Sequence, residues 1–274
     1  MVGETLQVAV LQSRREGNWR DSLRRVLSIL SRSRVEAEVL ALSENWLSRD
    51  PLDAEDYAYA LEKVGEEFAG DVLGGSNYVA ESGEPRSVGL VLAQGRVLRA
   101  CEKIFPSQAV GERSRIAPGR LLPPVDLRGW RIQCVICVDI FYPEVSRVGT
   151  ILGAEIIYNP ASIPSDRIEL WRSVLLSRAA ENTVFTIGVN GVGYVYPDGR
   201  ITLGSSSVYA PNGVMIGGMG TGEGVSVFLL DKQVIRRIRE RWAFYSDLTR
   251  IISARVYRDV DKLVGTRLLA GDSQ

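Results

Sequence analysis

Apolar and polar positions alternate in blocks along the chain, and each block has the period of one kind of element. Residues 6–12 (LQVAVLQ) form a short apolar run that is typical of a buried β-strand. In residues 18–34 an apolar side chain recurs every third or fourth position and arginines fill the other face, which predicts an amphipathic helix. Residues 37–44 form a second apolar run that ends in a carboxylate, and residues 54–69 again have helical spacing. The chain therefore begins as alternating strands and helices.

The later blocks add hairpins to this alternation. Gln-Gly at 94–95, within 87–103, and Asn-Gly at 212–213 are sequences typical of hairpin turns. Pro143 suits the first turn of a helix over 143–152. Further predicted strands cover residues 71–80, 130–139, 154–162, 184–195, 205–217 and 224–231, and further predicted helices cover residues 165–183 and 232–242.

This pattern predicts one layered α/β domain. No linker, low-complexity segment or long repeat interrupts residues 1–250, and a polar tail, residues 251–274, follows. Because βα units and hairpins both occur, we expect mixed sheets rather than an all-parallel doubly wound sheet. The glycines of residues 64–77 do not form a GxGxxG motif between a strand and a helix, and there is no Walker motif, so nucleotide binding has no support.

Charge and length limit the class of partner. The formal net charge is zero and the pI is about 6.5, so no positive field favours nucleic acid or an anionic membrane. The first residues, MVGETLQVAV, have neither a basic n-region nor a long apolar h-region, and no stretch approaches the length of a membrane span. We therefore expect a cytoplasmic protein that binds neither nucleic acid nor membrane.

The chain contains no histidine, which restricts its possible chemistry. Ser-His-Asp and Cys-His catalysis, His-containing zinc sites and two-His iron sites are all excluded. Acid–base chemistry near neutral pH must then use carboxylates, lysine, tyrosine or thiols with shifted pKa values. Lysine is also scarce, because most of the positive charge is arginine.

Three reactive side chains lie where apolar runs stop. Glu44 ends residues 37–44, Lys103 ends the predicted hairpin, and Cys137 lies near the end of residues 130–139. If these strand ends converge, Glu44 takes the thiol proton, Lys103 stabilises the negative charge and Cys137 attacks. The alternative is that the two charges are solvated and that Cys137 is a small core residue.

Cys134 and Cys137 are three residues apart, but they do not form a typical redox or metal pair. Redox CxxC motifs usually open a helix, whereas residues three apart on a strand point to opposite faces. Without histidine or a second CxxC, the pair is a poor zinc site, and we expect no metal. With Cys101 the chain has three cysteines, an odd set that does not suggest a disulfide framework, and we expect Cys134 to be a core residue.

The segments around these three residues resemble the nitrilase superfamily, the carbon–nitrogen hydrolases. The matching segments are ALSENWL around Glu44, CEKIFPS around Lys103 and ICVDIFYPE around Cys137, which fits the family pattern I-C-x-D-x-x-x-P-E. The resemblance continues to about residue 250 through NPAS, SRAAENTVFTIGVNGVG and GSSSVYAPNGVM, in the family's order.

This resemblance implies a fold and a set of site residues. The fold is an αββα sandwich, with two mixed sheets packed between helix layers. Glu44, Lys103 and Cys137 form the triad of a cofactor-free thiol hydrolase, and the backbone amide of Val138 binds the oxyanion. Glu112, in GERSRIAPG, occupies the place of a second glutamate that orients substrate or water, although an ion pair with a nearby arginine is an equal alternative. Trp46, Tyr142 and Trp171 are candidate pocket residues, and each is equally suited to packing.

The resemblance also implies a substrate class and an assembly. Val138 and Asp139 follow the cysteine where nitrile-cleaving members tend to have tryptophan and glutamate, which favours an amide or N-carbamoyl substrate. Phe141 stands where many members have arginine, which weakens the case for a carboxylate on the substrate. Family members pair as homodimers or higher homo-oligomers, and tail residues 251–274 are candidates for crossing the interface. The alternatives are an N-acyltransferase that uses the same thioester and a non-catalytic small-molecule-binding or scaffold protein.

Overall fold

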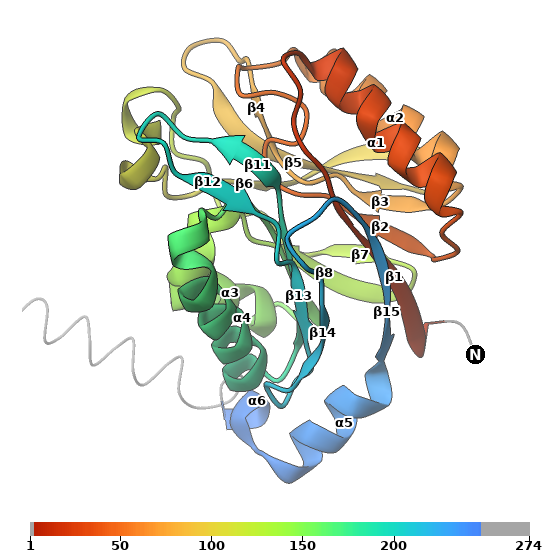
Figure 1. Ribbon diagram of the computed structural model, residues 1–274. Coiled ribbons are helices and arrows are strands. Elements are labelled where there is room, and N and C mark those ends of the chain that lie inside the picture. The colour runs from red at the N-terminus through yellow and green to blue at the C-terminus, as the bar shows by residue number, and fades with distance from the viewer. Residues whose placement is uncertain (1–2, 248–274) are drawn as a thin grey trace, which may run out of the picture.

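The computed structural model describes residues 3–247, which fold into two mixed β-sheets with helices on both outer faces. Figure 1 shows α1 and α2 on one side of the molecule and α3 and α4 on the other, with both sheets between them. This arrangement confirms the predicted αββα sandwich. The helices are α1 (Trp19–Ser33), α2 (Ala54–Phe68), α3 (Pro143–Ile151), α4 (Ile168–Asn182), α5 (Lys232–Arg241) and α6 (Phe244–Asp247).

Both sheets combine parallel and antiparallel neighbours, as the mixture of βα units and hairpins predicts. In the first sheet the order is β15 (Gly224–Asp231), β1 (Thr5–Gln12), β2 (Val39–Ala41), β3 (Asp71–Leu73), β5 (Arg86–Ala93) and β4 (Asn77–Val79), with β6 (Arg96–Glu102) also paired to β5. In the second sheet the order is β14 (Met215–Gly218), β13 (Ser207–Tyr209), β10 (Phe185–Asn190), β9 (Ile156–Ala161), β8 (Trp130–Cys134) and β7 (Val125–Leu127). A separate ribbon pairs β11 (Val192–Val195) with β12 (Ile201–Leu203).

Two apolar cores follow from this layering. The larger core lies between the sheets and under α4, and the smaller one lies between the first sheet and the helices α1 and α2. The residues of β9 are buried along its whole length, which is typical of a strand covered on both faces. Each sheet is therefore fixed on both faces, and the loops at its edge extend from a rigid base.

The predicted hairpins and two predicted helices are confirmed. Gln94 and Gly95 both have positive φ, 50° and 75°, in the tight turn that joins β5 to β6. Gly213, with φ of 79°, lies in the turn between β13 and β14. The α3 helix begins at Pro143 as expected, and α5 covers almost all of the predicted basic helix.

Two predicted strands are wrong in extent. Residues 71–80 divide into β3 and β4 because Gly75 has φ of 72° and a Cβ there would lie 2.1 Å from the carbonyl oxygen of Ser43. The strand predicted over residues 130–139 stops at Cys134, and a 3₁₀ turn, η3 (Cys137–Phe141), follows it. Cys137 consequently lies in the first turn after the strand and not within it.

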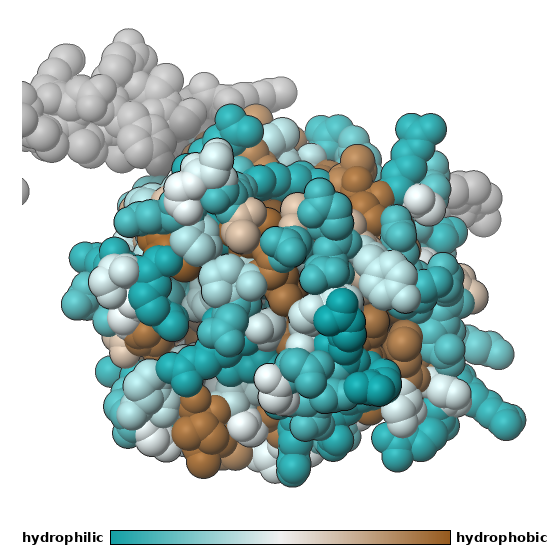
Figure 2. Space-filling model, turned by 90° about the horizontal axis from the view of Figure 1, so that it is seen from above, coloured by the Kyte–Doolittle hydropathy of each residue, from teal (hydrophilic) through white to brown (hydrophobic). Residues whose placement is uncertain are grey.

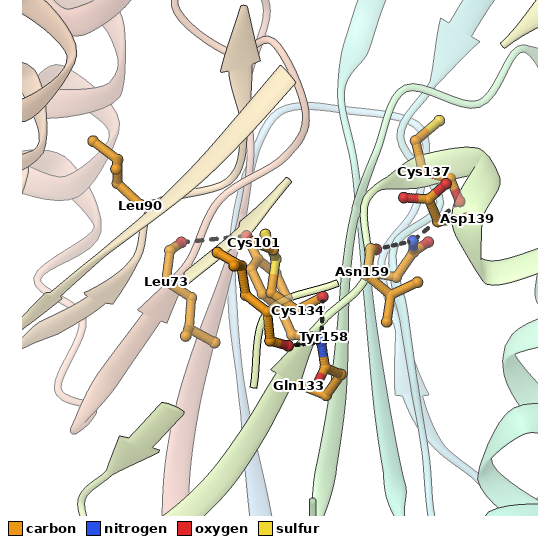
Figure 3. The surroundings of a disulfide bond; sticks show 12 residues. Leu73, Leu90, Cys101, Gln133, Cys134, Cys137, Asp139, Tyr158 and Asn159 are labelled. Carbon is orange, nitrogen blue, oxygen red and sulfur yellow. Dashed lines mark hydrogen bonds between the residues drawn. A yellow bond between two sulfur atoms is a disulfide. The ribbon is translucent and has the colours of Figure 1, made fainter. Parts of the chain in front are cut away.

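Cys101 of β6 and Cys134 of β8 form a disulfide that joins the two sheets, with 5.7 Å between their Cα atoms. Figure 3 shows this bond in the space between the sheets. A Cβ on Gly89 of β5 would lie 2.3 Å from the Cys101 sulfur, so a glycine is needed to make room for the bond. The expectation of no disulfide is therefore wrong. Cys134 is buried in the larger core, as predicted.

Two further points concern membrane-spanning helices and the C-terminal tail. No helix within residues 3–247 is both long and apolar enough to cross a bilayer. The tail predicted to cross a dimer interface, residues 251–274, lies outside the described residues.

Candidate active site

The structure brings the three predicted catalytic side chains together in one pocket of about 310 Å³. Glu44 follows β2, Lys103 directly follows β6, and Cys137 opens the turn after β8. Their exposed fractions are 1%, 1% and 8%, respectively. The first sheet thus supplies the carboxylate and the ammonium, and the second sheet supplies the thiol.

Lys103 lies between two carboxylates. Its Nζ donates to Glu44 Oε1 over 2.8 Å and to Glu112 Oε1 over 2.7 Å. Burial alone would lower the pKa of Lys103, but the charges of Glu112 and Glu44 raise it well above its ordinary value. The side chain therefore stays an ammonium. Because an ammonium has three N–H donors, two carboxylate partners leave a third donor for a substrate oxygen.

Glu112 belongs to this cluster and does not pair with a neighbouring arginine. Besides Lys103, it accepts hydrogen bonds from the Tyr78 hydroxyl over 2.7 Å and from the Ser107 amide over 2.6 Å. Burial would raise the pKa of Glu112, but the Lys103 ammonium and these hydrogen bonds hold it below its ordinary value. The alternative of a solvated loop ion pair is therefore wrong.

Glu44 is held at its second oxygen by Ser162, which follows β9. Ser162 Oγ donates to Glu44 Oε2 over 2.6 Å, and the hydroxyl group of Tyr196 lies 3.0 Å from the same Oγ. Both residues line the pocket. Sequence reasoning assigned them no role, although Ser162 closes the NPAS motif that contributed to the family resemblance.

The backbone at Cys137 has a left-handed conformation, with φ of 46°. Such a conformation is uncommon for a residue with a side chain, so its surroundings must hold it in place. Asn159 of β9 does so, donating from Nδ2 to Val135 O over 2.6 Å and to Cys137 O over 3.2 Å (Figure 3). Trp171 in turn donates from its indole nitrogen to Asn159 Oδ1 over 2.7 Å. Trp171 therefore supports the turn at Cys137 from within the core and does not line the pocket.

The Cys137 thiol is neutral at rest. Burial raises the pKa of Cys137 well above its ordinary value, and the nearby Glu44 charge raises it further, while Lys103 opposes the shift. A neutral thiol is a weak nucleophile, so attack requires that a base remove the proton as the bond forms. Glu44 lines the same pocket, and its carboxylate is close enough to Cys137 for its charge to affect the thiol.

Asp139 links the cysteine turn to the lysine loop. Its carboxyl group accepts from the amides of Ile104 and Phe105 over 2.8 and 2.9 Å. These side-chain hydrogen bonds reach the segment directly after Lys103. Burial raises the pKa of Asp139 to about 7, although the two amide hydrogen bonds oppose this shift.

Arg178 of α4 also holds the turn. It forms an ion pair within its helix, with 2.7 Å between Nη1 and Glu181 Oε1. Its Nε also donates to the carbonyl oxygen of Ile140 over 2.9 Å, within η3. The helix ion pair was predictable from spacing, but the contact with the turn was not.

The remaining sequence candidates divide between pocket and core. Val138 lines the pocket beside Cys137, as the oxyanion prediction requires. Trp46 does not, because it is fully buried in the smaller core, where its indole nitrogen donates to Gly74 O over 2.7 Å. Tyr142 stacks on Phe105 with 3.9 Å between ring centroids and lies outside the pocket lining. Both aromatic assignments are therefore corrected.

The pocket has an apolar wall and a basic mouth. The apolar wall includes Phe141, Ile163, Pro164 and Tyr194. The lining also includes five arginines. Figure 2, a view from above Figure 1, shows mostly hydrophilic residues with apolar ones between them. No group of three or more potential metal ligands occurs within residues 3–247. The pocket therefore offers carboxylates, an ammonium and a thiol for chemistry on a small molecule.

Solved structures of other proteins share this fold. A carbon–nitrogen hydrolase from Helicobacter pylori G27 superposes with a TM-score of 0.82 at 20% identity, over 93% of this chain and 98% of its own. An amidase from Nesterenkonia sp. superposes with a TM-score of 0.73 at 21% identity, over 88% and 96%. At these identities the likeness concerns the fold alone.

Sequence relatives extend the likeness. The (R)-stereoselective amidase of a Pseudomonas species is 28% identical over 273 residues, 95% of this chain and 96% of the relative. The 2-oxoglutaramate amidase of Bacillus subtilis is 25% identical over 238 residues, 83% of this chain and 91% of the relative. The family model described as carbon-nitrogen hydrolase matches residues 86–240, more than half of the sequence. The chain belongs to the carbon–nitrogen hydrolase family.

Proposed function

We propose that the protein hydrolyses the C–N bond of a small amide or N-carbamoyl compound through a thioester on Cys137. The observation that carries this proposal is the contact of Lys103 Nζ with both Glu44 and Glu112 in the pocket that Cys137 lines. Two relatives that match most of this chain bear amidase names, which supports the amide as the substrate class.

The first half of the reaction forms the thioester. Glu44 removes the proton from the Cys137 thiol as sulfur attacks the carbonyl carbon. The negative charge that develops on the carbonyl oxygen is stabilised by the Lys103 ammonium and the Val138 amide. That amide lies in the first turn of η3, where backbone N–H groups lack intrahelical partners. Glu44 then gives its proton to the leaving nitrogen, the C–N bond breaks, and ammonia or an amine departs.

The second half regenerates the enzyme. Glu44 removes a proton from water as the water oxygen attacks the thioester carbon. The second tetrahedral intermediate uses the same oxyanion donors, and its collapse breaks the C–S bond. Glu44 returns the proton to the departing sulfur, which restores the neutral thiol favoured by its buried position. Glu112 fixes Lys103 throughout and orients the substrate nitrogen or the hydrolytic water.

Ammonia release is the direct test. The wild-type protein is incubated with a panel of primary amides and N-carbamoyl compounds, with Cys137→Ala as the blank. Glu44→Gln keeps the shape of the side chain but removes the base, so we expect a loss of about 10²- to 10⁴-fold in kcat. Intact-protein mass spectrometry after an acid quench is expected to show the acyl group on Cys137 in the wild type only.

Several outcomes would contradict the proposal. Ammonia release that persists in Cys137→Ala would exclude the thioester. Transfer of the acyl group to added amines, with no hydrolysis in their absence, would identify an acyltransferase. A complete lack of turnover, with no acyl group on Cys137, would favour a binding or scaffold role. We also propose a homodimer or higher homo-oligomer, which light scattering at several protein concentrations measures.

A further inference from the structure

The mouth of the active-site pocket carries an excess of arginine. Within residues 3–247, five arginines line it, and the acidic lining residues are Glu44 and Glu112, both of which contact Lys103. The buried cluster of Glu44, Glu112 and Lys103 therefore has one net negative formal charge, which does not balance the five positive charges of the arginines. The lining arginines are Arg15, Arg49, Arg115, Arg167 and Arg200.

These arginines fall into two groups. Arg200 lies 2.7 Å from a carboxylate oxygen of Asp198, and Arg167 lies 3.8 Å from one of Asp166. For Arg15, Arg49 and Arg115, no carboxylate of residues 3–247 lies within ion-pairing distance. Three positive charges at the mouth thus lack a protein anion in the described part of the chain.

Of these three arginines, Arg15 is held in place by two contacts with the protein. Its side chain is half-buried, Nη1 donates to the carbonyl oxygen of Asn45 over 3.2 Å, and its guanidinium carbon lies 4.5 Å from the centroid of the Tyr194 ring. Asn45 directly follows Glu44 in the chain, so the guanidinium is anchored to the same segment that carries Glu44. One N–H is used in this anchor, and the remaining donors of the planar fork are suited to a carboxylate.

We propose that the substrate carries a carboxylate remote from the scissile amide, and that Arg15 binds it while Arg49 and Arg115 supply a supporting positive field. This inference rests on the proposed hydrolase function and specifies its substrate class. A concave site of one charge sign with apolar walls concentrates ligands of the opposite sign. Phe141 was taken as evidence against such a carboxylate. The structure provides positive charge from other elements of the same pocket.

A matched substrate series tests the inference. Succinamate, glutaramate and adipamate are compared with butanamide, pentanamide and hexanamide, which have the same carbon chains without the carboxylate. At the best chain length we expect kcat/KM to favour the carboxylate by about 10- to 100-fold, the range of a charge-assisted hydrogen bond. The preference is expected to shrink as salt is raised, because Arg49 and Arg115 are exposed.

Variants assign this preference to one residue. Arg15→Gln should reduce the preference for the carboxylate at least about tenfold, and Arg15→Lys should restore part of it. Arg167→Gln is the matched control, because it removes a lining arginine that has a carboxylate neighbour, and the preference should stay within about threefold of wild type. Equal losses for both substrate types in Arg15→Gln would overturn the role of Arg15.

The inference and the proposed function can fail separately. Hydrolysis of the neutral amides without any preference for carboxylates would overturn only the inference. If no compound is hydrolysed, the inference is tested by whether glutaramate and pentanamide bind to the Cys137→Ala variant. A rise in its melting temperature with millimolar glutaramate, and none with pentanamide, supports the anion subsite, whereas equal responses or none overturn it.

Discussion

Ser162 Oγ donates a hydrogen bond of 2.6 Å to Glu44 Oε2, while Lys103 holds the other oxygen of the same carboxylate. The Glu44 carboxylate is thus fixed at both oxygens, by Lys103 after a strand of the first sheet and by Ser162 after a strand of the second. A carboxylate fixed in this way cannot rotate away from the thiol. In the proposed reaction, the precision of proton transfer therefore depends on a serine that makes no covalent bond to the substrate.

Ser162→Ala should lower kcat more than it changes KM. Without the hydroxyl, Glu44 loses one of its two restraints, and we expect a drop of about 10- to 100-fold in kcat, typical of a misplaced acid–base group. Steady-state kinetics over a range of pH give the measurement, because altered positioning also shifts the acid limb of the profile. Ser177→Ala, at an exposed site on α4, is the control. Unchanged kcat in Ser162→Ala would contradict the positioning role.

Lys103→Met should abolish activity and also destabilise the fold. The substitution leaves Glu44 and Glu112 buried without their shared cation, and breaking such a group typically costs about 3–5 kcal/mol. The free energy of unfolding, measured by urea denaturation, is the readout. The double variant Lys103→Met with Glu112→Gln removes one of the stranded charges, so it should be more stable than the single variant. The reverse order would show that the two carboxylates do not share the lysine.

The raised pKa of Asp139 predicts that the free energy of unfolding falls as pH rises. Its folded pKa of about 7 exceeds the ordinary value of 3.8, so the folded state binds the proton more tightly than the unfolded state. The contribution of Asp139 is therefore largest at low pH and is lost as pH rises through 7. Between about pH 5.5 and 7, this loss amounts to about 2 kcal/mol.

Asp139→Asn isolates this effect. The chain has no histidine, so no residue with an ordinary histidine pKa obscures the window. Urea denaturation at several pH values should give a declining free energy of unfolding for the wild type and a flatter profile for the variant. If both proteins decline in parallel, Asp139 is not the group that titrates.

The disulfide predicts a countable number of thiols. Without reductant, a thiol reagent added to the denatured protein should find one free thiol, that of Cys137, and three after reduction. The Cys137→Ala variant should give no free thiol without reductant and two free thiols after reduction. Because the bond closes a loop with a sequence separation of 33, its removal should lower the free energy of unfolding by about 3–4 kcal/mol. Three free thiols without reductant would contradict the bond.

The meeting of Glu44, Lys103 and Cys137 in one pocket was predictable because each of them lies in a distinctive local motif. Glu44, Lys103 and Cys137 end apolar runs, and such runs meet at one edge of a layered sheet. Their close neighbours were less predictable. Tyr78 reaches Glu112, Ser162 reaches Glu44 and Tyr196 reaches Ser162 only through tertiary packing, and a tyrosine or a serine is common in any loop.

The wrong predictions share one physical origin. Trp46 lies two residues after Glu44, but the sharp change of chain direction there, marked by φ of 50° at Asn45, turns its ring into the core. The pairing of Cys101 with Cys134 depends on how two sheets are stacked, which no spacing within a single strand encodes. Local sequence therefore predicted most elements, although not the extent of every strand, and it missed these two contacts inside the core.

The division of the triad between the two sheets has a consequence for how this protein can be studied. Glu44 and Lys103 follow strands of the first sheet and Cys137 follows a strand of the second, so the proposed reaction requires that the two sheets be docked in register. Catalytic activity then serves as a sensitive gauge of inter-sheet assembly. During refolding, the return of activity should follow the closing of the core between the sheets and not the formation of either sheet alone.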